Sequence, residues 1–146
     1  MSISLIGPNL NENNLQESLA NLGMQHGVSL SFLPSIPHDK VAETLSNYSF
    51  CYTGSPKTVD KSAIEGALMG CFVLSENVNV LEQTGMNEVW KVIGQNAPQT
   101  ISKQIEILRN FESRIDLREI IIQNAAQRNN LNSTTTKILG QLGKND

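Results

Sequence analysis

The sequence has few of the residues on which metal, redox and covalent chemistry usually depend. Among 146 residues there are two cysteines and two histidines. His26 and His38 stand alone, and neither forms an HxxxH or CxxC pattern with a neighbour, so the spacing predicts no metal site. Cys51 and Cys71 fall inside expected strands, where we interpret them as small core residues in a reducing compartment.

The signature motifs of several enzyme classes are also missing. There is no G-x-S-x-G, no G-x-G-x-x-G and no G-x-x-x-x-G-K-[ST] in the chain. These absences argue against a serine hydrolase of the common type, a dinucleotide oxidoreductase and a P-loop enzyme.

Charge and hydropathy exclude further classes. The formal net charge is −3, and no basic cluster favours nucleic acid as a partner. No apolar run approaches the roughly 18–20 residues of a membrane-spanning helix. The start of the sequence does not resemble a signal peptide, so we expect a cytoplasmic protein. The length predicts one domain over residues 1–146.

The most informative stretch lies between residues 50 and 76. Residues 50–52 and 71–74 are short apolar runs that predict strands, and residues 59–69 have the spacing of a helix. Gly70 stands where a helix commonly ends. Because neither strand alternates apolar and polar residues, the pattern favours a parallel pair buried on both faces.

The rest of the chain continues the alternation of strands and helices. Further strands are expected at 3–6, 28–33 and 88–93, and further helices at 11–22, 37–47, 97–111, 115–128 and after residue 132. Gly23 is expected to end the first helix, and Pro37 to begin the second. Residues 77–85 are expected to form a loop with one helical turn. The prediction is a three-layer α/β domain with about five mainly parallel strands, in which residues 97–146 are mostly helical.

In such a sheet, ligands bind outside the carboxyl ends of the strands. The segments that follow the expected strands are 7–9, 33–35, 53–55 and 75–77. The helix that begins near residues 59–62 could receive an anion there, and Lys57 and Lys61 add positive charge. A solvated loop with exposed lysines is the alternative.

Glu65 stands out within its helix, because its neighbours Ala63, Ile64, Gly66 and Ala67 are small or apolar. A carboxylate in that setting needs water, a cation or hydroxyl donors. One interpretation is an exposed Glu65 paired with Lys61, one helical turn earlier. The other is a ligand role.

The stretch Ile64–Ser75, IEGALMGCFVLS, resembles the donor-domain signature of retaining glycosyltransferases with the GT-B architecture, the glycogen synthase and sucrose synthase-like group. In that signature a glutamate is followed by a small residue and an alanine, then by a glycine and a strand, as at Glu65, Gly66, Ala67 and Gly70. The order of elements is similar over most of the chain, and only residues 64–75 are specific. The resemblance implies a Rossmann-like fold that binds a nucleoside-diphosphate sugar without a metal.

The resemblance also assigns roles to individual residues. It assigns Glu65 to the ribose hydroxyls of the nucleotide. It implies backbone contacts to the base around Phe32, Leu33 and Pro34. The residues expected to face the diphosphate or the sugar are Ser55, Lys57, Lys61 and Ser62.

The sequence departs from the family in three respects. Lys57 stands eight residues before Glu65, where the family has an acid that touches the donor sugar. The strand and helix that usually open the donor domain, with an arginine and a lysine that clamp the diphosphate, have no counterpart. The acceptor domain has none either. The resemblance therefore implies a partner, either the missing acceptor domain or another copy of the chain, with any membrane contact made by the missing part.

Three functions remain open at this point. The first is the donor domain of an enzyme that transfers a sugar to a glycan or lipid, inactive without an acceptor domain, and with no catalytic residue that we can name. The second is a non-catalytic α/β interaction module. The third is a domain similar to response regulators, although no aspartate ends an early strand to form their acidic pocket.

Overall fold

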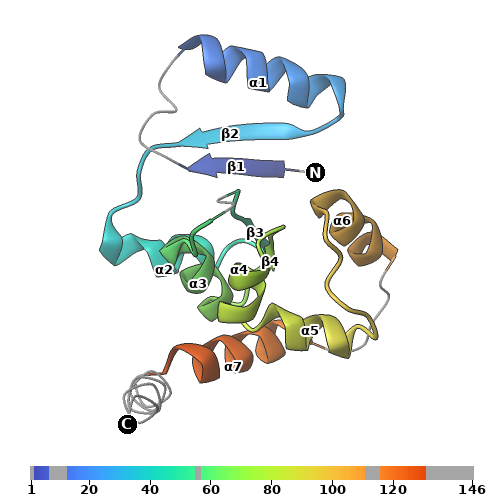
Figure 1. Ribbon diagram of the computed structural model, residues 1–146. Helices are drawn as coiled ribbons and strands as arrows, with labels where there is room; N and C mark the ends of the chain where they lie inside the picture. The colour runs from blue at the N-terminus through green and yellow to red at the C-terminus, as the bar shows by residue number, and fades with distance from the viewer. Residues whose placement is uncertain (1, 7–12, 55–56, 111–115, 131–146) are drawn as a thin grey trace, which may run out of the picture. The chain divides into compact units, whose positions relative to one another are not determined.

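The structure is a computed structural model, and it describes residues 2–6, 13–54, 57–110 and 116–130 (Figure 1). The contacts divide the chain into two compact units, Met1–Val41 and Ala42–Asp146, and each is described by itself. Both units contain a pair of parallel strands connected through a helix, which confirms the α/β class. The expectation of a single domain over residues 1–146 stays a prediction.

The first unit is a small strand–helix–strand arrangement. It contains strand β1 (Ser2–Ile6), helix α1 (Asn13–Gln25), strand β2 (Ser29–Leu33) and the short 3-10 helix η1 (His38–Lys40). β1 and β2 are parallel, with Ile3 opposite Leu30 and Leu5 opposite Phe32. The two strands expected in this part of the sequence are therefore confirmed.

Helix α1 does not end at Gly23, where the sequence places its end. It continues to Gln25, and Gly27 adopts the left-handed backbone with φ 65°. The N–H of Val28 donates to the carbonyl of Gly23 at 2.8 Å, as in a Schellman motif. Gly23 serves close packing instead, because a Cβ there would lie 3.0 Å from Cγ of Leu30. Helix α1 therefore lies against the face of the sheet that carries Leu30.

The expected helix over 37–47 is two shorter elements. Pro37 is extended, with φ −55° and ψ 144°, and it directly precedes η1. Helix α2 (Val41–Leu45) follows η1. Pro37 therefore stands just before the first helical turn and not within it.

The second unit contains the stretch that the sequence made prominent. Strand β3 (Phe50–Tyr52), helix α3 (Lys61–Leu68) and strand β4 (Phe72–Leu74) form a parallel crossover, with Cys51 opposite Val73. Gly70 has φ 82°, and the N–H of Cys71 donates to the carbonyl of Gly66 at 2.9 Å. The helix end predicted at Gly70 is confirmed.

The burial expected for these strands is only partly present. β4 is buried along its whole length, whereas Phe50 and Tyr52 of β3 are 52% and 64% exposed. α3 packs on one face of both strands, with Gly66 against Cys51 of β3, and Trp90 packs edge-on against Phe72 of β4 on the other face, at 5.2 Å. Phe50 and Tyr52 lie on the second face of β3, where such cover is lacking.

The segment 88–93, expected to be a strand, is a helix. α4 (Val78–Gln83) and α5 (Met86–Val92) meet at Gly85, which has φ 72°. Met86, Val89 and Trp90 recur at helical spacing and are all fully buried. The β-branched residues of this segment favoured a strand, but their burial on one helical face determines the structure.

Two longer helices complete the second unit, α6 (Ile101–Asn110) and α7 (Leu117–Asn129). α7 packs against α3 and α5, and Ile121 and Ala125 enter the same core as Trp90 and Phe72. The helix expected after residue 132 lies outside the described residues. Among the described residues, no helix combines the length and apolar character needed to cross a membrane.

The expected sheet of about five strands is not formed within the described part of the chain. Four strands are present there, in two separate two-stranded parallel sheets, β1–β2 and β3–β4. The fifth expected strand is the segment that forms α5.

Candidate functional site

The carboxyl ends of β3 and β4 carry a group of hydrogen-bonded polar side chains. Thr53 directly follows β3 and is buried, and its hydroxyl donates to Oδ2 of Asp60 at 2.5 Å. Asp60 is the residue that precedes α3. This hydrogen bond fixes the start of α3 against the end of β3.

Asn77 holds the same loop from the side of β4. Its Nδ2 donates to the carbonyl of Thr58 at 3.2 Å, while its Oδ1 accepts from the N–H of Asn79 and caps α4. The N–H of Asn77 also donates to Oγ of Ser75 at 3.1 Å. The segment before α3 is thus held between two strand ends, which pre-organises this edge of the sheet.

Gln104 fastens helix α6 to the end of β4. Its side chain is completely buried, and Nε2 donates to the carbonyls of Ser75 and Pro98, each at 2.8 Å. Its Oε1 accepts from the N–H of Ser75 at 3.3 Å. The amide therefore pairs with both backbone groups of Ser75, much as a neighbouring strand would.

Lys61 and Glu65 are the two expected site residues that the structure brings into direct contact. Nζ of Lys61 lies 3.3 Å from Oε1 of Glu65, one turn apart on α3. The Glu65 side chain is 23% exposed, while the Lys61 side chain is 72% exposed. The ion pair that the spacing suggested is confirmed, and Glu65 keeps access to solvent.

The other expected residues are distributed over both units. Lys57 and Ser62 are exposed near the start of α3. Phe32 and Leu33 are half-buried at the end of β2, and Pro34 after them is exposed; these three belong to the first unit. Ser55 lies outside the described residues.

The sequence placed Thr53 and Asn77 in the segments after expected strands and Asp60 at the start of the helix, but it predicted neither their hydrogen bonds nor a role for Gln104. Gln104 had one local signal, since it interrupts the apolar stripe of Ile101, Ile105 and Leu108 on α6. The other three come together through the crossover, so their pairing depends on tertiary structure.

The two cysteines do not provide a nucleophile. Burial, with smaller contributions from the charges of Cys71 and Asp60, raises the pKa of the Cys51 thiol to about 11. Burial also raises the pKa of Cys71, opposed by Arg118. Both thiols are therefore protonated at neutral pH and have little reactivity. No group of three or more potential metal ligands occurs among the described residues.

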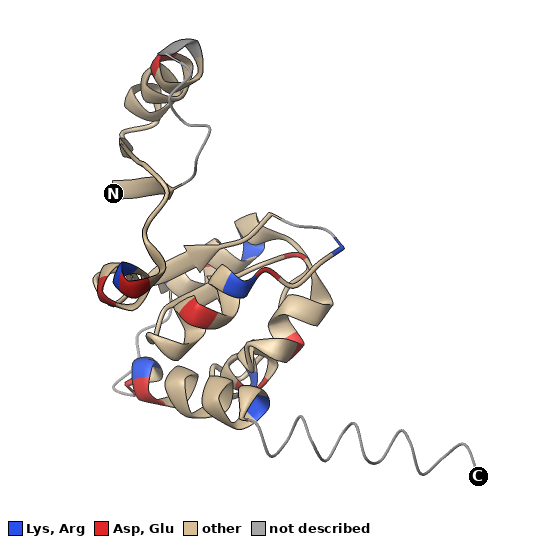
Figure 2. Cartoon of the chain, turned by 90° about the vertical axis from the view of Figure 1, so that its left-hand side faces the viewer, with Lys and Arg blue, Asp and Glu red and all other residues tan. Residues whose placement is uncertain are grey.

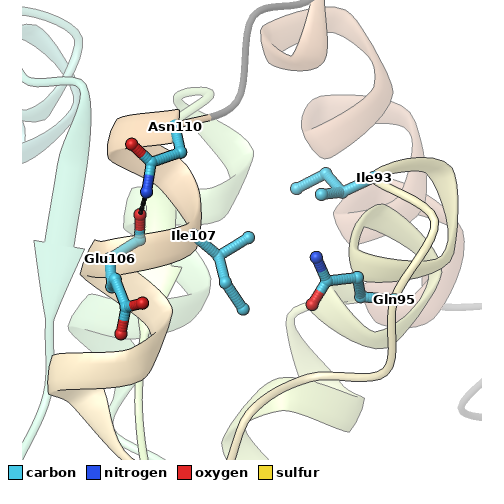
Figure 3. A pocket seen from close by; sticks show the side chains of 5 residues that line it. All are labelled: Ile93, Gln95, Glu106, Ile107 and Asn110. Carbon is cyan, nitrogen blue, oxygen red and sulfur yellow. Dashed lines mark hydrogen bonds between the residues drawn. The ribbon is translucent and has the colours of Figure 1, made fainter.

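A shallow cavity of about 270 Å³ lies elsewhere in the second unit, between α6 and the segment after α5 (Figure 3). It is lined by Ile93, Gln95, Glu106, Ile107 and Asn110, none of which is an expected site residue. Asn110 donates to the backbone carbonyl of Glu106, and Glu106 is paired with Lys103, so these two polar side chains bond within α6.

Comparison with known proteins adds no relative: no protein-family model, no curated protein and no solved structure matches this chain.

Proposed function

We propose that the chain binds a nucleoside-diphosphate sugar at the carboxyl edge of β3 and β4, as a donor domain of the GT-B glycosyltransferase type. The observation that carries the proposal is the placement of Glu65. On α3, Ala63, Gly66 and Ala67 are buried, while Glu65 keeps a partly exposed carboxylate. This carboxylate stands in a stretch that has the helix, left-handed glycine and strand that the resemblance requires.

The chemistry of such a site follows from the groups present. A carboxylate accepts hydrogen bonds from two ribose hydroxyls, and the ion pair with Lys61 orients it for that purpose. The start of α3 offers its dipole to the diphosphate, with the exposed residues Lys57 and Ser62 beside it. The hydrogen bonds of Thr53 and Asn77 hold that loop before a ligand arrives, which lowers the entropic cost of binding.

Several parts of the proposal rest on the resemblance alone. They are the contacts of the base with Phe32, Leu33 and Pro34, a role for Ser55, and transfer of the sugar to a glycan or lipid. In a complete enzyme, transfer would proceed by stabilising an oxocarbenium-like state and the departing diphosphate. The resemblance further implies transfer without a metal and an acceptor-binding domain as the partner of this one.

The test is a calorimetric titration of the chain with UDP, GDP and ADP and with their sugar conjugates. For the nucleotide that binds, Glu65→Gln should weaken binding by roughly tenfold to a hundredfold, since a hydrogen bond to a charged group contributes about 1.5–3 kcal/mol. Glu106→Gln is the matched control, because Glu106 is also a helical glutamate paired with a lysine, Lys103 at 2.9 Å.

Two results would contradict the proposal. One is the absence of binding to the native chain at millimolar nucleotide. The other is equal affinity for the native chain and Glu65→Gln.

A second function, a non-catalytic interaction module, is favoured by one feature of β3. Phe50 and Tyr52 expose two aromatic side chains on the same face of an edge strand, which is unusual for a surface without a partner. Lys57 stands where the family has an acid that touches the donor sugar, which agrees with a domain that no longer transfers sugar. A chain that binds no nucleotide in the titration would fit this function.

A further inference from the structure

The first unit leaves apolar side chains uncovered on one of its two strands. Ile3 and Ile6 of β1 are 36% and 39% exposed, whereas β2 has no large hydrophobic side chain that is exposed. Among the described residues of this unit, Gly23 alone is buried, so no described side chain is fully enclosed. A two-stranded sheet with so little core is not expected to be stable without further pairing.

The free edge of β1 has none of the features that usually prevent strand pairing. Within the described strands, β1 pairs with β2 alone. Residues 2–6, SISLI, contain no charge and no proline. Figure 2 shows the same absence of charge along both strands of this unit. The opposite edge of the sheet belongs to β2, which α1 packs against and which Pro34 directly follows.

We propose that β1 pairs in antiparallel orientation with β1 of a second copy of the chain, about a two-fold axis at Ser4. The result is a continuous four-stranded sheet in the order β2, β1, β1, β2. This inference does not depend on nucleotide binding, and it would hold for a donor domain as well as for an interaction module.

The residues of β1 suit this register. With Ser4 opposite Ser4 of the second copy, Ile3 lies opposite Leu5 of that copy. Ile3 and Leu5 are on one face, because they pair with Leu30 and Phe32 of β2. Since the strand has no charge, pairing with an identical copy brings no like charges together. A charged partner strand would find no opposite charge on β1 with which to pair.

The proposed two-fold axis also places the two α1 helices. A two-fold axis perpendicular to the sheet keeps both α1 helices on the same face, the face of Leu30. Leu15 and Leu22 lie seven residues apart on α1 and remain 42% and 52% exposed. Because α1 packs against β2, the two helices lie over the outer strands, about three strand spacings (roughly 14 Å) apart, and these leucines are not part of the proposed contact.

The test uses charge at the proposed axis. The native chain should sediment as a species of twice its 16.0 kDa mass, with dissociation on dilution. Ser4→Lys and Ser4→Glu, each alone, should raise the dimer dissociation constant by about fivefold, because like charges meet directly across the axis. An equimolar mixture of the two variants should form a heterodimer that is tighter than either homodimer.

Ser31→Lys is the matched control. Oγ of Ser4 and Oγ of Ser31 lie 2.8 Å apart, so this variant loses the same hydrogen bond on the same face, but on the outer strand. Its charges would be about three strand spacings apart, roughly 14 Å, and largely screened. Its dissociation constant should equal the native value, which separates pairing at β1 from damage to the sheet.

The proposal is overturned if the native chain stays at the mass of one copy at the highest concentration reached. It is also overturned if Ser4→Lys dimerises as well as Ser31→Lys, or if the mixture of opposite charges gains no affinity. Far-ultraviolet circular dichroism of each variant verifies that the secondary structure is retained.

Discussion

The chain contains two parallel strand–helix–strand units, β1–α1–β2 and β3–α3–β4, that share a topology and differ in burial. In the first, Gly23 is the only described residue that is buried. In the second, β4 is buried throughout and α3 contributes Ala63, Gly66 and Ala67 to the interior. Both units have the same strand–helix–strand connection between parallel strands, so this topology by itself does not create a buried core.

The difference lies in what packs on each unit. α3 is covered by α7, and the opposite face of β4 meets Trp90 of α5. The first unit has α1 on one face of its sheet, while the other face carries serines such as Ser4 and Ser31. A parallel sheet needs cover on both faces. The comparison therefore predicts that stability resides in the second unit and that the first gains its stability from association.

The largest effect should come from truncating the centre of the second core. Trp90 is fully buried in contact with Phe72, so Trp90→Ala should lower the free energy of unfolding by about 3–5 kcal/mol. Phe32→Ala, in the half-buried sheet of the first unit, should cost less than half as much. Urea denaturation followed by circular dichroism measures both. Equal losses would remove the distinction between the two units.

Trp90→Phe sharpens this result. It keeps an aromatic ring against Phe72 and removes the indole Nε1, which has no hydrogen-bond partner in the described part of the chain. Its loss should therefore be well below that of Trp90→Ala. A loss as large as that of alanine would mean that the indole N–H has a partner after all.

The sequence predicted the local features of this second unit well. The crossover, its parallel pairing and the helix end at Gly70 follow from apolar runs and one glycine. The contact between Lys61 and Glu65 follows from their spacing of four residues. Each depends on neighbours along the chain, which is the information that a single sequence holds.

Features that depend on tertiary contacts were not predicted. Val89, Val92 and Ile93 have strand propensity, yet α5 forms because Met86, Val89 and Trp90 share a buried helical face. The exposure of Phe50 and Tyr52 could not be read from β3 itself, since it reflects the lack of a second cover. The hydrogen bonds of Asp60 and Gln104 likewise join segments that are distant in sequence.

A smaller difference in the free energy of unfolding is expected between alanine substitutions at glycines that have a left-handed backbone. Gly85 has φ 72°, and a Cβ there would lie 2.7 Å from Cβ of Asn124 on α7, so Gly85→Ala should cost about 2–4 kcal/mol. Gly27 of the first unit has φ 65°, and nothing lies within 4 Å of its added Cβ. Gly27→Ala should therefore cost only the backbone strain, about 1–2 kcal/mol.

Gly94→Ala serves as the control within the second unit, because Gly94 has φ 86° and an equally open surrounding. The denaturation midpoints of the three variants measure the cost of each substitution. If Gly94→Ala matches Gly85→Ala, strain and not the approach of α7 sets the cost.

The last effect should appear at alkaline pH and only in the second unit. Burial raises the pKa of Cys51 to about 11, above its value of 9.0 in an unfolded chain. Folding therefore favours the protonated thiol, and its contribution to stability is complete below pH 9 and lost as the pH rises towards 11. The shift corresponds to about 2 kcal/mol at most, since one unit is worth about 1.4 kcal/mol and Cys51 is not fully enclosed.

Comparing the native chain with Cys51→Ala at each pH isolates this contribution from the lysines and tyrosines that titrate in the same range. Because both cysteines lie on β3 or beside β4, amide exchange should show the alkaline loss in the helices that cover that sheet, while β1, α1 and β2 keep a pH dependence common to both proteins. A loss of equal size in Cys51→Ala would assign the alkaline instability to other groups.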